Sequence, residues 1–271
     1  MEETIVKVDH LSHRYSVQWA IRDINFEVPK HGIYGLLGSN GAGKSTTMNI
    51  MCGVLRQSEG DVYIKGISMS KNPVEAKRHI GFLPQNPPLH MDLTVTEYLE
   101  YCAALRYIPD REIPQAVKKV LERCGISHFS KRLLRNLSGG YQQRVGIAQA
   151  IIHNPDFVVL DEPTNGLDLL AKKQLMTLLQ DYARYHQASI FITSHDASFI
   201  EKVSTRVVVI QEGRLYREGT FEEIFGNVHQ HEVYHLLLDK SSESVLRQRF
   251  SELDYKVLDG GISVETRIPD L

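Results

Sequence analysis

Short apolar runs bounded by turn residues divide the first part of the chain, a pattern typical of β-strands. They predict four strands, at residues 4–8, 24–28, 33–37 and 61–64. Between the third and fourth runs, apolar residues recur at helical spacing from Lys44 toward Gly60, which predicts one helix. This alternation of strands and a helix favours an α/β fold.

The middle of the chain is dominated by helical periodicity. A short strand at residues 80–83 is followed by apolar spacing that predicts helices at 94–106, 113–124 and 139–152. Two continuous apolar runs then appear, at 157–160 and 189–193, with a helix between them. Such runs are expected for strands that are buried on both faces of a parallel sheet.

A hairpin and then a change of pattern mark the last part of the chain. Residues 206–210 and 214–218 flank a short turn and predict the hairpin, and the pattern changes after Gly226. Beyond that point we expect a strand, a helix and a strand pair, at 233–238, 242–253 and turning at 259–261. The tail is therefore expected to form a small α+β unit of its own.

These patterns suggest two domains. We expect a main domain at residues 4–222, with a helical subdomain at about 86–152 inserted in it, and an accessory unit at 223–271. The early strands are expected to form an antiparallel β subdomain beside the mostly parallel central sheet.

Composition narrows the functional classes. A net charge of −2 argues against the clustered basic surface that nucleic-acid binding requires, so no nucleic-acid partner is expected. The three cysteines are scattered, which fits a reducing cytosol better than a disulfide frame or a metal site. No run approaches the ~18 apolar residues of a membrane span, and the start lacks the features of a signal peptide. We therefore expect a cytoplasmic protein, which could still bind a membrane partner.

The most informative segment is GSNGAGKST, which follows the apolar run at 33–37. Its spacing matches the glycine-rich loop that holds phosphate groups between a strand and a helix. Glycines leave backbone N–H groups free to face the phosphates, and the helix start adds its positive dipole end. A lysine at its end can bind the outer phosphates, and the following serine can bind Mg²⁺. The predicted nucleotide-binding residues are Gly38, Ser39, Asn40, Gly41, Ala42, Gly43, Lys44, Ser45 and Thr46.

Two acids at the end of the 157–160 run indicate what is done with the nucleotide. Asp161 and Glu162 lie where the strands of open α/β sheets bind ligands. Asp161 can hold Mg²⁺ together with Ser45, while Glu162 can orient the attacking water, as phosphoryl transfer to water requires. The alternative for the pair alone is a simple helix cap. Kinases, GTPases and motor ATPases all remain open at this point.

The stretch LSGGYQQR at residues 137–144 closely resembles the signature sequence of the ATP-binding-cassette (ABC) ATPases. It also lies some twenty residues before the strand that ends in Asp161 and Glu162, as in that family. Other elements follow in the family's order. Tyr15 resembles the aromatic residue that stacks on adenine, and Gln85 resembles the glutamine that senses the Mg²⁺ site. Asp168 resembles the acid of the loop that crosses the dimer interface, and His195 resembles the switch histidine.

The resemblance implies a P-loop NTPase fold and a catalytic cycle. In the family, two subunits pair head to tail, and each signature closes over the ATP held by the other subunit. Here Ser138, Gly139 and Gly140 would contact that ATP, while Glu162, His195 and Gln85 would act in its hydrolysis. The implied cofactors are ATP and Mg²⁺. The implied partners are a second cassette subunit and a multi-span membrane permease, which this chain would bind from the cytoplasmic face of the membrane. A homodimer is the expected pairing, and pairing with a related cassette remains open.

The leading hypothesis is the ATPase subunit of a bacterial exporter whose permease is a separate chain. Soluble cassette ATPases that act on nucleic acid or ribosomes are the alternative, but those usually have paired cassettes, a long coiled coil or a basic surface. A small-molecule kinase could also contain GSNGAGKST, yet it would not explain LSGGYQQR. Each site residue taken singly could be structural, and the order of the motifs favours the functional interpretation.

Overall fold

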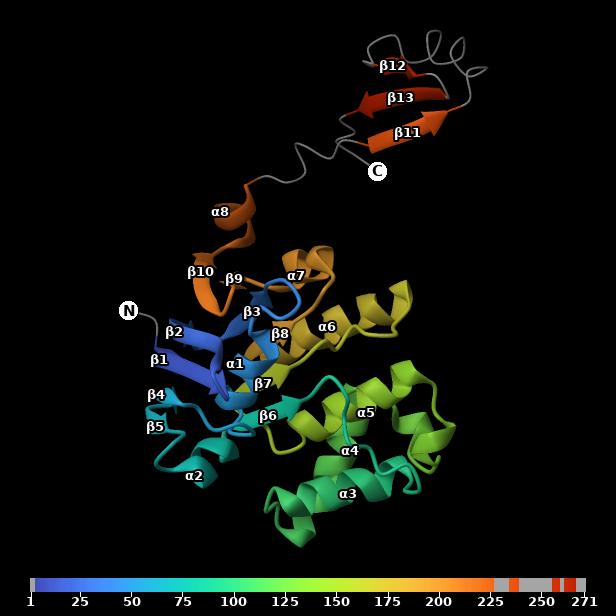
Figure 1. The fold of residues 1–271 in the computed structure, drawn as a ribbon. Helices are drawn as coiled ribbons and strands as arrows, with labels where there is room; N and C mark the ends of the chain where they lie inside the picture. Colours follow the sequence, from blue (N-terminus) through green and yellow to red (C-terminus); the bar gives the residue numbers. More distant parts are fainter. Residues whose placement is uncertain (1–2, 227–233, 239–254, 259–260, 267–271) are drawn as a thin grey trace. The chain divides into compact units, whose positions relative to one another are not determined.

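The computed structural model describes residues 3–226, 234–238, 255–258 and 261–266. The chain divides into two compact units, residues 1–220 and 221–271 (Figure 1). No helix in the described ranges is both long enough and apolar enough to cross a membrane.

A six-stranded sheet forms the centre of the first unit. Its strands lie in the order β10-β9-β3-β8-β7-β6, and all pairs are parallel except β9 with β10. The strands are β3 (Gly32–Leu37), β6 (Ile80–Leu83), β7 (Phe157–Leu160), β8 (Ser189–Thr193), β9 (Arg206–Gln211) and β10 (Arg214–Gly219). Because β3, β8, β7 and β6 are parallel, the segments that follow them meet at one edge of the sheet.

A second, antiparallel sheet packs beside the first. Its order is β2-β1-β4-β5, from β1 (Thr4–Tyr15), β2 (Gln18–Pro29), β4 (Glu59–Ile64) and β5 (Ile67–Ser68). The first two strands are longer than the sequence pattern indicated, because register shifts interrupt the alternation of buried and exposed residues. Leu11, Ser12 and His13 are all buried in succession. A strand predicted from the alternation of apolar and polar residues therefore ends before the observed strand does.

The core lies between the two sheets, with helix α1 (Lys44–Met51) packed in it. Met48, Ile50 and Met51 of this helix are fully buried in the same cluster as residues of both sheets. Phe26 of β2 stacks on Phe191 of β8, with ring centroids 5.7 Å apart. Helices α6 (Leu169–His186) and α7 (Ala197–Val203) lie on the opposite side of the central sheet (Figure 1).

Helix α1 ends earlier than its apolar spacing suggested. The predicted helix ran toward Gly60, but the observed one ends at Met51. Gly53 adopts φ +64°, its N–H donates to Ile50 O, and the Val54 N–H donates to Asn49 O at 2.8 Å. This double hydrogen bond is a Schellman ending, in which a glycine takes the left-handed position and stops the helix.

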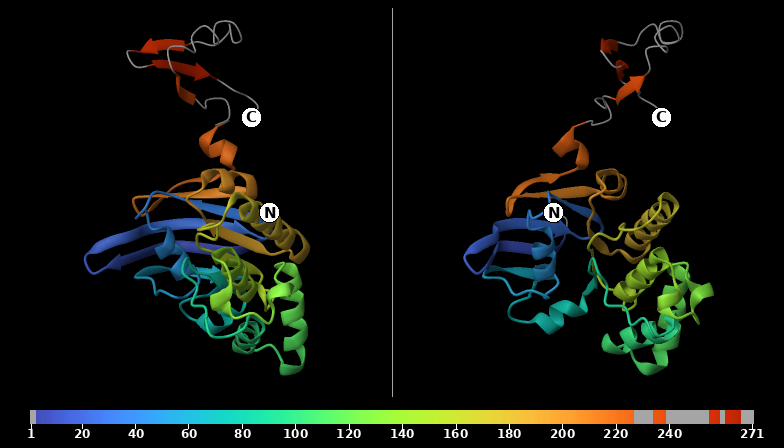
Figure 2. Two further views of the ribbon diagram at one scale, coloured as in Figure 1. Left: turned by 90° about the vertical axis from the view of Figure 1, so that its right-hand side faces the viewer. Right: turned by 45° about the vertical axis from the view of Figure 1, so that its right-hand side comes forward.

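Apart from β6, the chain between β5 and β7 is mainly helical. Its helices are α2 (Pro73–Arg78), α3 (Val95–Leu105), α4 (Ile113–Arg123) and α5 (Gly139–Ile151), with short 3₁₀ turns at Asp110–Glu112, Ser127–Phe129 and Leu134–Asn136. Helices α3, α4 and α5 pack against one another, in green to yellow-green in Figure 2. The last three α-helices match the predicted ranges to within a residue or two. Helix α3 begins with a capping box, in which Thr94 and Glu97 hydrogen-bond each other's backbone N–H groups.

The second unit begins with α8 (Phe221–Phe225) and contains a three-stranded antiparallel sheet. Its strands are β11 (Tyr234–Leu238), β12 (Tyr255–Leu258) and β13 (Gly261–Thr266), in the order β11-β13-β12. The helix expected at 242–253 and the residues 259–260 of the expected turn lie outside the described residues.

Candidate functional site

The glycine loop connects β3 to α1 at the edge where the parallel strands end. Gly38 is required by close packing, because a Cβ there would lie 2.3 Å from Ile210 O. Gly43 adopts φ +104° directly before α1, and a Cβ there would lie 2.4 Å from Ile21 Cγ2. Glycine therefore brings the loop backbone against both sheets and leaves the first N–H groups of α1 facing outward.

Lys44 is the first residue of α1 and is folded back over the loop. Its Nζ donates to Gly38 O at 2.8 Å and to Ser39 O at 3.0 Å. These hydrogen bonds hold the ammonium group beside the loop N–H groups, where positive charge favours an anion. Ser45 follows with its side chain exposed.

Asp161 and Glu162 follow β7 and are both buried, at 7% and 4% exposure. The hydroxyl of Thr193, at the end of the neighbouring strand β8, connects them. It donates to Asp161 Oδ1 at 2.7 Å and accepts from the Glu162 N–H at 2.9 Å. Glu162 itself adopts φ +51°, a left-handed conformation that is uncommon outside glycine and concentrates at functional sites.

The carboxylate of Glu162 meets His195 at the end of β8. Oε2 accepts from the His195 backbone N–H at 3.1 Å, and Oε1 lies 3.2 Å from His195 Nε2. That second approach is not aligned as a hydrogen bond. The imidazole is about half exposed, so one of its faces remains accessible beside a buried carboxylate.

The segment after His195 is held by an ion pair. Lys172 Nζ of α6 donates to Asp196 Oδ2 at 2.7 Å, and this hydrogen bond lowers the pKa of Asp196. The ionised Asp196 also caps α7 by accepting from the Phe199 N–H at 3.1 Å. The position of the histidine is thus fixed from the helix that follows it.

One cavity of about 520 Å³ brings most of the predicted site residues together. It is lined by Tyr15, Ala20, Asn40, Gly41, Gly43, Lys44, Ser45, Thr46, Gln85, Asp161, Glu162 and His195. Gly38, Ser39 and Ala42 belong to the same loop without lining the cavity. Tyr15 comes from the end of β1 and is 55% exposed, so a flat ring stands open at the rim.

The remaining predicted residues line a different cavity, of about 340 Å³. Ser138, Gly139 and Gly140 form the start of α5, and Asp168 faces the same space from the start of α6. Asp168 caps α6 by accepting from the Ala171 N–H at 2.7 Å. The Ser138 hydroxyl makes no such cap bond on α5, so it is free to contact a ligand. Within one chain, therefore, the predicted site residues fall into two separate cavities, which we call the two half-sites.

Sequence reasoning missed Thr193. The available signal was its place, at the end of a parallel strand next to the one that ends at Asp161. The hydroxyl of the neighbouring Ser194 is hydrogen-bonded to that of Thr164, at 2.8 Å.

A buried strand, a glycine loop opening a helix, and two acids at the end of an adjacent parallel strand define a nucleoside-triphosphate-binding protein of the P-loop class. The family model described as ABC transporter matches residues 21–165. The chain is 35% identical over 259 residues to the bacitracin transport ATP-binding protein BcrA of Bacillus licheniformis, which covers 96% of this chain and 84% of that protein. This chain belongs to the ABC transporter family.

Solved structures agree with that assignment. The cbiO1 protein of Clostridium perfringens, described as part of an ABC transporter complex, superposes with a TM-score of 0.76 at 28% identity, over 92% of this chain and 97% of that one. A dimeric ATP-binding cassette in a post-hydrolysis state, bound to ADP and Pi, gives 0.73 at 26% identity, over 79% and 98%. The predicted fold class is confirmed, and the protein is the ATP-hydrolysing subunit of an ABC transporter.

Proposed function

We propose that two copies of this chain pair head to tail, so that each ATP is enclosed between the glycine loop of one copy and the signature segment of the other. The observation that carries this proposal is the separation of the two half-sites into different cavities of one chain. The similarity to a dimeric cassette supports it. Closure on ATP and opening after hydrolysis would then drive transport.

The geometry supports specific roles in nucleotide binding. Lys44 and the loop N–H groups hold the phosphates, and the ring of Tyr15 stacks on the base. Across the interface, Ser138 and the N–H groups at the start of α5 bind the phosphates of the partner's ATP, near Asp168. The cavity that each residue lines supports its proposed role.

The oxygen atoms of Ser45, Gln85 and Asp161 fit Mg²⁺, which prefers hard oxygen ligands. All three residues line the larger cavity. No group of three or more His, Cys, Asp or Glu in the described ranges could hold a metal ion. We therefore assign the remaining ligands to phosphate oxygens and water, as is usual for this ion. A bound Mg²⁺ neutralises phosphate charge during phosphoryl transfer.

Hydrolysis is assigned to Glu162 with His195 and Gln85. The buried Glu162 carboxylate orients the attacking water and accepts its proton, while His195 contacts the terminal phosphate. Thr193 fixes the direction of both acids through its two hydrogen bonds. Gln85 lies on the loop between β6 and α3, which can transmit the state of the site to the helices beyond it.

We infer that the transporter is an exporter and that the permease is a separate multi-span protein on whose cytoplasmic face this subunit binds. Similarity to a protein named for bacitracin transport supports the exporter assignment. Similarity to one described as part of a transporter complex supports the separate permease.

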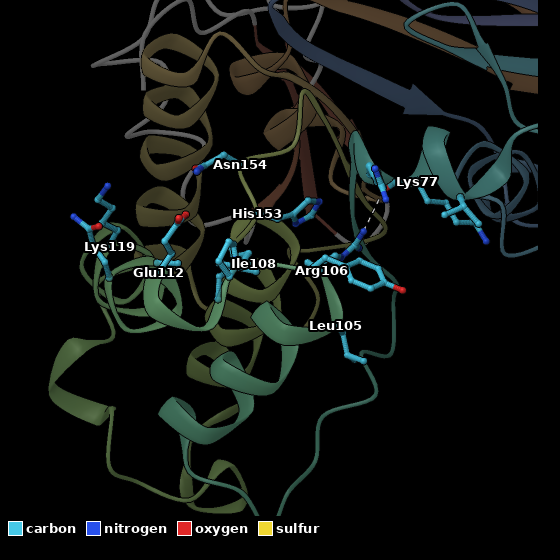
Figure 3. A pocket seen from close by; sticks show the side chains of 15 residues that line it. Lys77, Leu105, Arg106, Ile108, Glu112, Lys119, His153 and Asn154 are labelled. Carbon is cyan, nitrogen blue, oxygen red and sulfur yellow. Dashed lines mark hydrogen bonds between the residues drawn. The ribbon is translucent and has the colours of Figure 1, made fainter.

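A cavity of about 770 Å³ is the surface that we assign to the permease (Figure 3). Its lining comes from α2, the end of α3, the start of α4 and residues 152–154 after α5. Four cations and one acid line it: Lys77, Arg78, Arg106, Lys119 and Glu112. The apolar side chains of Val74, Leu105 and Tyr107 are 60–81% exposed around it. This combination suits an amphipathic segment that bears acidic side chains.

Arg106 is the central cation of this cavity. Its Nη1 donates to Lys77 O at 3.1 Å, and burial lowers the pKa of its guanidinium. Among the described residues no carboxylate pairs with this partly buried cation, which makes its burial costly, and a docked acid would offset that cost.

The proposed function can be tested by recovering partners. Tagged Glu162→Gln protein, which retains ATP, would be solubilised gently from its native cells and purified. We expect a multi-span membrane protein to be recovered with it. Recovery of ribosomes, nucleic acid or the self-dimer alone would contradict transport and favour the soluble cassette ATPases.

The docking surface has its own control in the same experiment. Arg106→Glu in the Glu162→Gln background should lose the membrane protein while still forming the ATP-bound dimer. Recovery of the membrane protein at an unchanged level would show that this cavity is not the permease surface.

A further inference from the structure

His13 is a buried polar side chain that is not used in the site as described so far. It lies on β1, is 8% exposed, and neither ring nitrogen makes a hydrogen bond to any described residue. Burying an imidazole without hydrogen bonds lowers the stability of the fold. An apolar side chain would fill this position at a lower cost in folding free energy. A specific contact of the imidazole ring is therefore needed to explain why a histidine is here.

That contact is with Tyr15. The two ring centroids are 4.7 Å apart and the ring planes meet at 81°, an edge-to-face arrangement that aromatic pairs favour. A register shift lies between His13 and Arg14, so the measured ring contact, and not regular strand alternation, is what brings the two side chains together. Tyr15 ends β1 and is 55% exposed. The buried imidazole of His13 therefore packs against the exposed ring of Tyr15.

The backbone places His13 there by breaking the regular alternation. Register shifts lie on either side of His13 in the pairing of β1 with β2, and they turn it inward next to the buried Ser12. His13 is the register partner of Ile21 on β2, and Ile21 Cγ2 lies against Gly43 of the glycine loop. His13 thus contacts the ring at the rim of the nucleotide cavity, and its register partner packs against the glycine loop.

We propose that His13 is a positioning residue for the nucleotide base. Its imidazole fixes the orientation of the Tyr15 ring through the edge-to-face contact, so that the ring is ready to stack on adenine before ATP binds. This inference rests on the proposed role of Tyr15. It predicts that His13 influences binding of the base and leaves binding of the phosphates unaffected.

Steady-state ATPase kinetics of the full chain test this proposal. We expect His13→Ala to raise the KM for ATP roughly 2- to 10-fold, the range that an aromatic pair contributes. The kcat at saturating ATP should stay within about twofold, because the groups that act on the terminal phosphate are untouched. Inorganic tripolyphosphate has no base, so its inhibition constant should not change. His13→Phe keeps an aromatic edge against Tyr15 and should restore the KM.

Controls separate this role from a purely structural one. Leu11→Ala makes a cavity in the same buried strand and should lower the melting temperature without raising the KM. In a double-mutant cycle, His13→Ala should add little to Tyr15→Ala, since both remove one interaction. Equal weakening of ATP and tripolyphosphate, or additive effects with Tyr15→Ala, would overturn the proposal.

The proposed role of Tyr15 can fail separately. A Tyr15→Ala variant with an unchanged KM would refute base stacking itself. A raised KM for Tyr15→Ala together with an unchanged KM for His13→Ala would refute only the inference about His13.

Discussion

Glu162 combines features that seldom occur together in one residue. It is an acid with 4% exposure, its backbone is left-handed, and His195, whose imidazole lies beside its carboxylate, is about half exposed. The backbone strain is offset by the hydrogen bond from its N–H to Thr193 and by that from the His195 N–H to its carboxylate. Such an arrangement holds the carboxylate in one direction, which a group that orients water requires.

The first prediction concerns that carboxylate. Glu162→Gln keeps the size of the side chain but removes its capacity to accept a proton. We expect ATP turnover to fall by roughly 100-fold or more, while ATP binding stays intact and the ATP-bound dimer accumulates. Phosphate release and size-exclusion chromatography with ATP would measure both. Wild-type turnover would exclude Glu162 as the group that activates water.

The partly buried His153 leads to a prediction about pH. Its Nε2 donates to Ile80 O at 3.1 Å, while Nδ1 is buried without a partner among the described residues. Burial, with the nearby Arg106, lowers the pKa of His153 to about 4. In the unfolded chain its pKa is near the ordinary ~6.5, so the unfolded state binds more protons between these values. The free energy of unfolding should therefore fall as the pH drops from about 6.5 toward 4, by about 2–3 kcal/mol from this residue.

Chemical denaturation at several pH values checks this prediction. His153→Gln does not titrate in that range, so its free energy of unfolding should vary less between pH 4 and 6.5 than that of the wild type. Parallel curves for the two proteins would show that His153 does not contribute to acid sensitivity.

At the scale of elements, local patterns located α3, α4 and α5 to within a residue at each end. Thr94 and Glu97 form the box that begins α3, and the predicted start at 94 lies at that cap. Apolar spacing alone failed at the end of α1, because Val54 continues the helical period but is 66% exposed. The decisive residue was Gly53, whose left-handed backbone stops the helix.

Long-range structure was harder to predict than local structure. The order of motifs pointed to the residues of the larger cavity, but Thr193 was missed because its two hydrogen bonds depend on β7 and β8 being neighbours. The full length of β1 was missed because its register shifts depend on pairing with β2 and β4. The pattern of one sequence gives the local spacing of apolar residues, but it does not show which strands pair or in what register.

The capping box of α3 provides a stability prediction for an element. Thr94→Ala removes the side chain that accepts from the Glu97 N–H, and it should lower the free energy of unfolding by about 1 kcal/mol. Thr96→Ala makes the same chemical change inside the helix, where no cap is lost, and should have little effect. Urea denaturation compares them. Equal losses for the two variants would show that the box contributes nothing measurable.

At the scale of the whole molecule, the separation of the two half-sites predicts how dimers form. Ser138→Arg places a long cation in the smaller cavity and leaves the glycine loop unchanged. We expect ATP to bind the monomer normally and the ATP-driven dimer to be lost. Ser127→Arg is the matched control, since it adds the same charge to an exposed residue of the same helical region that lines neither of these two cavities. Light scattering would measure the molar mass of both variants with ATP, each in the Glu162→Gln background. A normal ATP-driven dimer for Ser138→Arg would contradict head-to-tail pairing.

The same separation has a genetic consequence. If every ATP is enclosed by residues from two chains, a subunit with a damaged signature segment also inactivates one site of its intact partner. In a cell that makes both forms, the fraction of fully competent dimers would fall as the square of the intact fraction. Conversely, a Lys44→Ala chain paired with a Ser138→Arg chain would concentrate both lesions in one site and leave the other whole. Alleles of this subunit would thus be expected to show both dominance and intragenic complementation, depending on which half-site each one damages.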